Sequence, residues 1–412
     1  METTTYTTYQ FLEVNTPELA TAFLELPMKI YADDPNFIRP LDQDINKIFN
    51  PKKNKFFSHG DCTRWMMKND KGEYTGRVAV FINNRTLRKN NDQPTGGMGF
   101  FECINDQQAA NALFDKCKEW LEERNVEAMD GPINFGERNN WWGLLVEGFS
   151  EPTYAMNYHP PYYTELFENY GFQVYFKQFS YGLPMMMDRP EKYYAKSEEI
   201  FSNPDYHFEH VKKNTLEKYA IDFMNVYNKG WGKHAGFKQI KKAQAMKIME
   251  AMRPILREDL IWFGYYKDEA VAIFVMLPEV NKYFKYVNGK MNWWAKIKVK
   301  YHMMRGTCRK VFGAIFGVIP EHQRKGMEAA IIMAANKVVQ PQDRWDDIEL
   351  TWIGDFNPKM MRVAENLGAE IIKVHHTYRK IFDETKPFKR MRTIDGSDKE
   401  EDVEAEKTEM ES

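Results

Sequence analysis

The residues best suited to chemistry lie in a short basic turn in the second half of the chain. Residues 314–320 form an apolar run typical of a buried strand, and residues 328–339 have the apolar periodicity of a helix. Between them stand Gln323, Arg324, Lys325 and Gly326. N–H groups at a helix start lack intrahelical partners and lie at the positive end of the helix dipole, and glycine lets a phosphate approach the backbone. The turn therefore predicts a pyrophosphate site, with a plain solvated turn as the alternative.

Two internal similarities place this turn in the second of two related copies. The segment FENYGF at 167–172 recurs as AENLGA at 364–369, and VAVF at 78–81 recurs as VAIF at 271–274. The offsets, 197 and 193, are nearly equal and the order is the same. We therefore expect two copies of one fold, at 1–186 and 187–385, followed by a disordered acidic tail at 386–412.

The elements expected around the turn define the fold class. In the second copy the patterns predict a strand at 206–211, helices at 215–228 and 237–252, a hairpin at 260–277, and then strand, helix, strand, helix, strand. The first copy has the matching strand at 10–15, a helix from Pro17, a hairpin at 64–82, a strand at 98–103 and a helix at 106–124. Each copy is thus an α+β unit with a mixed sheet flanked by helices. Only Ile104, Asn105 and Asp106 stand at the turn of the first copy, which predicts one anion site per chain.

The turn resembles the loop of the GNAT superfamily of acyl-CoA N-acyltransferases, which reads Gln/Arg-x-x-Gly-x-Gly/Ala after a Val-x-Pro strand end. Gln323, Gly326, Val318 and Pro320 match. The resemblance implies tandem GNAT-like domains with mostly antiparallel twisted sheets. It also implies that acyl-CoA binds as a substrate at a set of residues around the turn: Val318, Gln323, Arg324, Lys325, Gly326, Met327 and Asn357.

Asn357 precedes Gly368 by eleven residues, which is the usual spacing of this superfamily. Two positions depart from its pattern. Glu328 stands where the superfamily has Gly or Ala and puts a carboxylate near the phosphate site, and Ala364 replaces a Tyr that often protonates the departing thiolate. The general acid is therefore unassigned.

A narrower resemblance extends over most of the chain. The segments at 99–102, 131–134, 143–149 and 158–163 resemble the YghO-like bacterial proteins, which have tandem GNAT-type domains. Some bacterial ceramide synthases, which N-acylate a sphingoid base with a fatty acyl-CoA, are similar to this family. The resemblance implies an amine acceptor, with a sphingoid base as the specific candidate.

Three residues are candidates for the chemical step. The amine must be neutral to attack a thioester, and the developing oxyanion needs a fixed donor. By resemblance, the N–H of Val318 is the donor. Glu349, on the strand expected beside the cofactor strand, and His159, from the first copy, are the candidate bases; a salt-bridged Glu and a core His are the alternatives.

Charge and composition bear on partners and location. The segment 282–310 holds nine basic residues and no acidic one, interleaved with aromatics: Lys282, Lys285, Lys290, Lys296, Lys298, Lys300, Arg305, Arg309 and Lys310. This pattern suits an anionic membrane surface or nucleic acid, with a charged surface hairpin as the alternative, and the acyl-CoA loop implied nearby favours lipid over nucleic acid. The start of the chain lacks a signal-peptide pattern, so we expect a cytoplasmic protein, peripheral on the inner membrane surface. The four cysteines lack ligand spacing, so we expect buried free thiols and no metal.

The sequence is also compatible with two other classes of function. An aminoacyl transferase built from tandem GNAT-like domains would use aminoacyl-tRNA, although the intact cofactor loop argues against it. A non-catalytic CoA- or lipid-binding protein is the other, favoured by Ala364 in place of Tyr.

Overall fold

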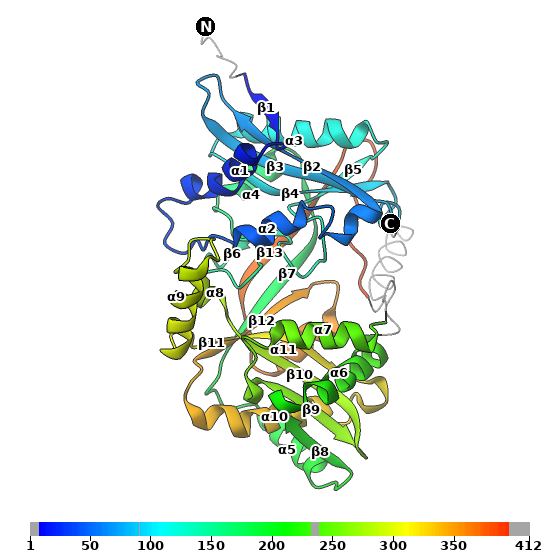
Figure 1. Ribbon diagram of the computed structural model, residues 1–412. Helices are drawn as coiled ribbons and strands as arrows, with labels where there is room; N and C mark the ends of the chain where they lie inside the picture. The colour runs from blue at the N-terminus through cyan, green and yellow to red at the C-terminus, as the bar shows by residue number, and fades with distance from the viewer. Residues whose placement is uncertain (1–7, 90, 232–238, 395–412) are drawn as a thin grey trace, which may run out of the picture.

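In the computed structural model, residues 8–89, 91–231 and 239–394 are described. They form two halves that share one sheet of thirteen strands (Figure 1). The strands are β1 (Gln10–Glu13), β2 (Gly60–Lys68), β3 (Tyr74–Asn83), β4 (Thr95–Cys103), β5 (Ala128–Gly131), β6 (Leu144–Glu147), β7 (Gln173–Pro184), β8 (Tyr206–His210), β9 (Ile261–Tyr266), β10 (Glu269–Pro278), β11 (Lys310–Val318), β12 (Asp347–Gly354) and β13 (Glu370–Ile381). The helices are α1 (Pro17–Ile30), α2 (Asp42–Ile48), α3 (Gln107–Glu122), α4 (Tyr163–Asn169), α5 (Glu191–Phe201), α6 (Leu216–Trp231), α7 (Lys242–Met252), α8 (Asn281–Phe284), α9 (Trp293–Met304), α10 (Met327–Val339) and α11 (Pro358–Asn366).

Helices cover both faces of the sheet because its strands are apolar on both sides. On β2, Trp65 and Met67 pack into the core that contains α3, whereas Met66 between them packs into the core that contains α1. Successive side chains of a strand point to opposite faces, so these adjacent residues fill two separate cores. In the second half, β10 and β11 likewise lie between α6 and α10.

The two halves repeat one strand pattern. In the first, β3 and β4 are antiparallel and β4 pairs in parallel with β5. In the second, β10 and β11 are antiparallel and β11 pairs in parallel with β12. The expected α+β class and the repeat are thus confirmed, including the hairpin expected at 260–277, which is β9 and β10.

The halves exchange their long closing strands. β13, from the end of the chain, pairs with β5 and β6 of the first half, while β7, from the first half, pairs with β12 of the second. The two strands pair with each other along nearly their whole length, from Glu370 opposite Gly182 to Arg379 opposite Gln173. They lie side by side through the middle of the molecule and continue the sheet from one half into the other (Figure 1).

The chain beyond β13 returns to the body. Lys386 pairs with Glu127, and the N–H of Met391 donates to the carbonyl of Tyr175 at 3.0 Å. The N–H of Ile394 donates to the carbonyl of Phe356 in the second half at 2.8 Å. Residues 386–394 therefore lie against both halves, and the rest of the acidic tail, 395–412, lies outside the described residues. Residues 237 and 238 of the helix expected at 237–252 also lie outside them, and α7 begins at Lys242.

Candidate functional site

The basic turn has the backbone conformation of an anion-binding loop. β11 ends at Val318, Pro320–His322 form one turn of 3-10 helix, and α10 begins at Met327. Arg324 and Gly326 both have positive φ, at 63° and 92°. A Cβ on Gly326 would lie 2.9 Å from the carbonyl oxygen of Lys196, so glycine is required by conformation and by contact. The first turn of α10, whose N–H groups lack intrahelical partners, borders the space beside this loop through Gly326, Glu328 and Ala329.

That space is a pocket of about 280 Å³ between α5, α10 and α11. Three basic side chains line it, from Lys192 and Lys196 on α5 and from Arg324 on the turn. The neighbourhood combines free helix N–H groups with positive charge, which suits the phosphates of a CoA. Glu328 also lines the pocket, and its Oε1 accepts a hydrogen bond from the N–H of Arg324 at 3.4 Å. The carboxylate anticipated from the sequence thus lies in the pocket.

The other expected cofactor residues have different surroundings. Gln323 turns back, and its Nε2 donates to the carbonyl of Val318 at 2.8 Å, which fixes the start of the turn. Lys325 is exposed beside the loop, whereas Met327 is fully buried and does not line the pocket. Asn357 caps α11, with its Oδ1 accepting from the N–H of Met360 at 3.4 Å.

Val318 stands where two strands separate. β11 and β12 pair only from Lys310 to Gly313 in the described part of this ladder. The N–H of Ile319 donates to the carbonyl of Val271 on β10 at 2.9 Å. Because successive amides of a strand point to opposite edges, the N–H of Val318 points toward the β12 side, into the gap that opens between the strands. An acyl carbonyl in this gap would meet a fixed donor.

Near the point where the strands separate, four apolar residues of β11 and β12 are half-buried: Ala314, Ile315, Phe316 and Leu350. The first half contacts β12 here, because the indole Nε1 of Trp352 donates to the carbonyl of Arg138 at 3.2 Å. The first half, which lacks the basic turn, therefore packs beside the candidate acyl site.

Glu349 is on β12 opposite Phe312, as expected for a neighbour of the cofactor strand, but it is fully buried and ion-paired. Lys373 and Lys310 approach its carboxylate at 2.9 Å and 2.6 Å. Burial opposes ionisation, yet the two ammonium groups more than offset it and hold the pKa of Glu349 below its usual value. Phe312 precedes Val318 by six residues, about 20 Å along the strand. These contacts give Glu349 a structural role, and its role as a base stays a prediction.

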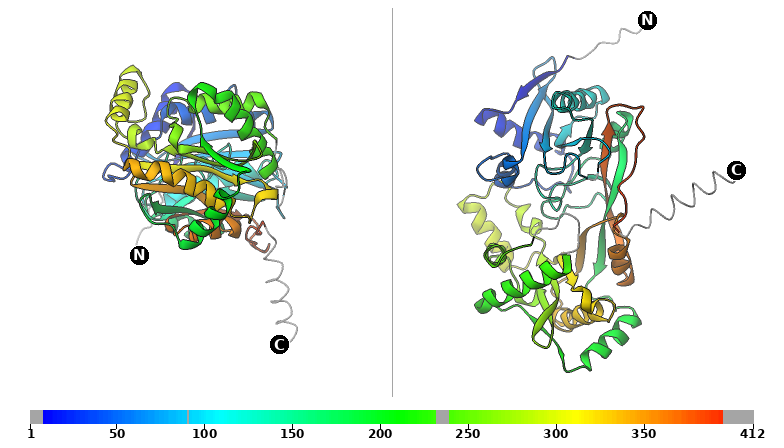
Figure 2. Two further views of the ribbon diagram at one scale, coloured as in Figure 1. Left: turned by 90° about the horizontal axis from the view of Figure 1, so that it is seen from below. Right: turned by 90° about the vertical axis from the view of Figure 1, so that its right-hand side faces the viewer.

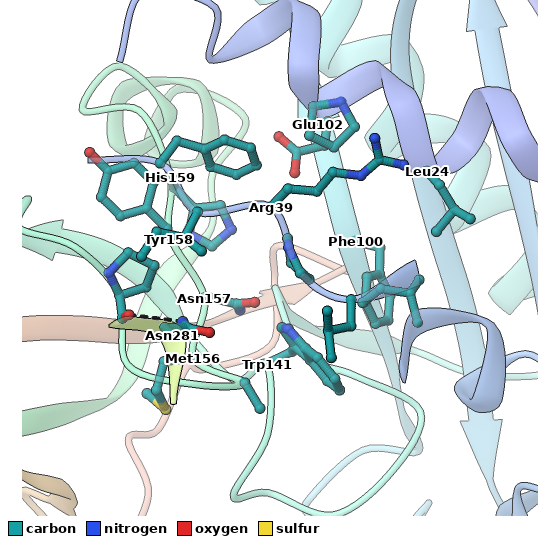
Figure 3. Close-up of a pocket in the computed structure, with 18 of the residues that line it drawn as sticks. Leu24, Arg39, Phe100, Glu102, Trp141, Met156, Asn157, Tyr158, His159 and Asn281 are labelled. Atoms are coloured by element: carbon teal, nitrogen blue, oxygen red, sulfur yellow. Dashed lines mark hydrogen bonds between the residues drawn. The ribbon is translucent and has the colours of Figure 1, made fainter. Parts of the chain in front are cut away.

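His159 lines a separate small cavity of about 60 Å³ in the first half (Figure 3). Its Nδ1 accepts from the N–H of Leu145 at 3.2 Å, so Nε2 carries the proton of the neutral ring. Burial lowers the pKa of His159 to about 3. A ring with that pKa is a weak proton acceptor, and its assignment as a base also stays a prediction. Glu102, Tyr158 and Trp141 share this cavity, with the apolar walls seen in Figure 3.

In the first half, protein groups already occupy the positions equivalent to the N–H of Val318 and to the start of α10. At the end of β4, the N–H of Cys103 donates to the hydroxyl of Tyr163 at 2.8 Å. At the start of α3, the Asp106 carboxylate accepts from the N–H of Ala109 at 2.9 Å, so a negative charge occupies the helix N-terminus. A pyrophosphate would be repelled there, which agrees with one anion site per chain.

Sequence reasoning missed Lys192 and Lys196. Their i, i+4 spacing after Pro190 was the available signal, because it places both side chains on one face of a short helix. Their approach to a turn more than one hundred residues further along the chain is a matter of tertiary packing.

Three other expectations concern metal, thiols and membrane. Among the described residues there is no cluster of three His, Cys, Asp or Glu side chains able to hold a metal ion. Three of the four cysteines are buried, as expected, and Cys62 is half-buried. None of the helices in the described part of the chain is long and apolar enough to cross a bilayer.

The comparisons with known proteins agree with this geometry. No protein-family model matches the chain. It is 25% identical over 379 residues to the bacterial ceramide synthase of Caulobacter vibrioides (strain NA1000 / CB15N), covering 90% of this chain and 96% of that protein. It is 26% identical over 378 residues to Protein YghO of Escherichia coli (strain K12), covering 87% and 92%.

Among solved structures, a tandem GNAT protein from the clavulanic acid biosynthesis pathway has a TM-score of 0.53 at 11% identity, over 93% of this chain and 100% of that one. A GCN5-related glucosamine N-acetyltransferase region of a fungal multi-domain protein has a TM-score of 0.52 at 10% identity, over 91% of this chain and 38% of that one. The chain thus has the tandem GNAT fold and is similar in sequence to YghO and to a bacterial ceramide synthase.

Proposed function

We propose that this protein is an N-acyltransferase that takes its acyl group from acyl-CoA. The observation that carries the proposal is the basic pocket at the start of α10, which lies beside the gap between β11 and β12. CoA phosphates in the pocket are met by Lys192, Lys196 and Arg324 together with helix N–H groups. The thioester then reaches the gap, where the N–H of Val318 stabilises the oxyanion.

The reaction joins an amine nitrogen to the acyl carbon. The nitrogen attacks the thioester carbonyl, the carbon–sulfur bond breaks, and CoA leaves as a thiol after taking up a proton, while the amide forms. The half-buried apolar residues near the gap suit an acyl chain. The similarity to the Caulobacter ceramide synthase supports a sphingoid base as the acceptor and a long-chain acyl group as the donor.

The activity is tested by following free thiol after mixing the protein with palmitoyl-CoA or acetyl-CoA and sphinganine. We expect thiol release that requires both substrates, with N-acylsphinganine as the product by mass spectrometry. CoA binding without thiol release for any amine would instead support a non-catalytic binding protein. Acyl transfer from aminoacyl-tRNA, with none from acyl-CoA, would support the aminoacyl transferase.

The site itself is tested by charge reversal. Lys196→Glu and Arg324→Glu should each weaken CoA binding at least about tenfold, since each removes a charge-assisted contact to phosphate. Lys71→Glu, in an exposed turn of the first half, is the matched control. CoA affinity unchanged in both pocket variants would place the cofactor elsewhere.

A further inference from the structure

We infer that α9 is a membrane-docking helix that inserts one face into the interface of an anionic lipid bilayer. The inference goes beyond the proposed function and does not depend on it. Its basis is an unpartnered apolar stripe on α9 that is bordered by unpaired lysines.

The helix has two apolar faces, and only one of them is used by the fold. Ala295 is buried with Leu41 and Val287, and Val299 and Met303 pack against the same side of the molecule. The stack of His302 on Tyr286, with ring centroids 3.7 Å apart, joins the helix to the segment that follows α8. This face therefore fixes α9 rigidly to the body.

The second apolar face has no protein partner among the described residues. Its side chains are 66%, 68%, 42%, 51% and 78% exposed, in the order Trp293, Trp294, Ile297, Tyr301 and Met304. At 100° per residue these five positions fall within an arc of about 100°. Figure 2 shows α9 at the margin of the molecule, protruding from the body, so a flat surface can reach the stripe.

Positive charge borders the stripe on both sides. On the same helical projection, Lys298 and Arg305 fall beside Trp294, and Lys296 and Lys300 fall beyond Trp293. None of these four has an ion-pair partner in the described structure. Tryptophan and tyrosine favour the headgroup region, and lysines beside them meet anionic headgroups, so the chemistry of the face matches an anionic bilayer.

The structure narrows the surface predicted from the sequence. Lys282 and Lys285 are paired with Glu151, at 2.5 Å and 3.1 Å. Arg309 pairs with Asp346 at 2.7 Å, and Lys310 pairs with Glu349 at 2.6 Å. These four basic residues hold the fold together, so the docking surface is confined to residues 290–305.

The inference is tested with the full chain and vesicles of phosphatidylcholine alone or with phosphatidylglycerol. We expect co-sedimentation with the anionic vesicles that falls with salt. The double variant Trp293→Ala/Trp294→Ala should weaken it at least tenfold, and Lys296→Gln/Lys298→Gln/Lys300→Gln should weaken it about 100-fold. The matched controls change exposed residues elsewhere: Tyr194→Ala, and Lys52→Gln/Lys53→Gln/Lys71→Gln.

Equal vesicle binding by the α9 variants and the wild type would overturn the inference. A protein that does not bind vesicles but forms dimers in sedimentation velocity, which the tryptophan variant separates into monomers, would also overturn it. In that case α9 would hold two chains together. Binding of single-stranded RNA that requires the α9 lysines, without vesicle binding, would overturn it in favour of nucleic acid.

Discussion

Glu349 and Lys373 form a buried ion pair across strand β7. The Lys373 ammonium nitrogen lies 2.9 Å from both carboxylate oxygens, and the two side chains are 0% and 3% exposed. Lys310 joins from the other side at 2.6 Å. One carboxylate thus pairs with two ammonium groups at the junction where strands from both halves meet.

This relationship predicts the result of Glu349→Gln. The variant leaves the buried Lys373 ammonium without its counter-charge and leaves Lys310 with Asp347 alone, so the free energy of unfolding should fall by about 3 kcal/mol. Urea unfolding at pH 7 measures the loss, and Asp347→Asn, at a half-exposed partner of Lys310, should change little. Turnover per folded molecule separates the two roles of Glu349, because a role in the ion pair alone leaves turnover unchanged. A fall of a hundredfold or more at unchanged stability would instead identify Glu349 as the base.

His159 predicts a pH dependence of stability. Its pKa is lowered from 6.5 to about 3 by burial, so the unfolded chain takes up a proton below pH 6.5 that the folded chain refuses. Stability from this residue is complete above pH 6.5 and is lost as the pH falls toward 3. The slope is about 1.4 kcal/mol per pH unit over that window.

The measurement compares urea unfolding of wild type and His159→Asn between pH 4 and 6.5. Asparagine retains an acceptor for the N–H of Leu145 but does not titrate, so the wild-type curve should be steeper by that slope. Subtracting the two curves also removes the opposite contribution of Glu279, whose pKa burial raises to about 7. Parallel curves would show that His159 titrates normally in the folded protein.

The exchange of β7 and β13 predicts that the halves do not fold apart. A fragment ending at residue 186 lacks β13, which is paired with both β5 and β6, and a fragment starting at 187 lacks β7, which is paired with β12. Each would expose the unpaired edges of apolar strands. We expect a single calorimetric transition for the full chain and insoluble fragments when each is expressed alone. Two soluble, cooperatively folding fragments would contradict this.

The same exchange marks the limit of prediction from sequence. Hydrophobic periodicity and the repeat identified β9, β10, β11 and the order of the fold, since those signals are local. β7 and β13 each follow an equivalent helix and have similar sequence patterns. No local signal therefore indicates which half of the sheet each strand joins. That choice depends on long-range pairing and on packing between the halves.

The candidate site also contains residues that the sequence could identify and residues that it could not. Gln323 to Gly326 could be recognised because a strand, a basic turn and a helix are consecutive. Lys192 and Lys196 could not, because they join the pocket through the packing of α5 on α10. Glu349 was placed on the correct strand, yet its two lysine partners come from β11 and β13, and pairing of that kind has no local pattern.

Glu328 provides the sharpest test of the anion pocket. Its carboxylate lines the pocket together with Lys196 and Arg324, where it opposes the charge of a bound phosphate. Glu328→Gln removes that charge and retains an acceptor for the N–H of Arg324, so CoA should bind about threefold to tenfold more tightly, with a gain that shrinks as salt rises. Isothermal titration measures the affinity at low and high salt.

Glu321→Gln, which removes an exposed charge outside the pocket lining, is the control and should change affinity less. Equal effects of the two variants would mean that only overall charge matters, and weaker binding by Glu328→Gln would mean that its carboxylate orders the turn rather than repelling the ligand.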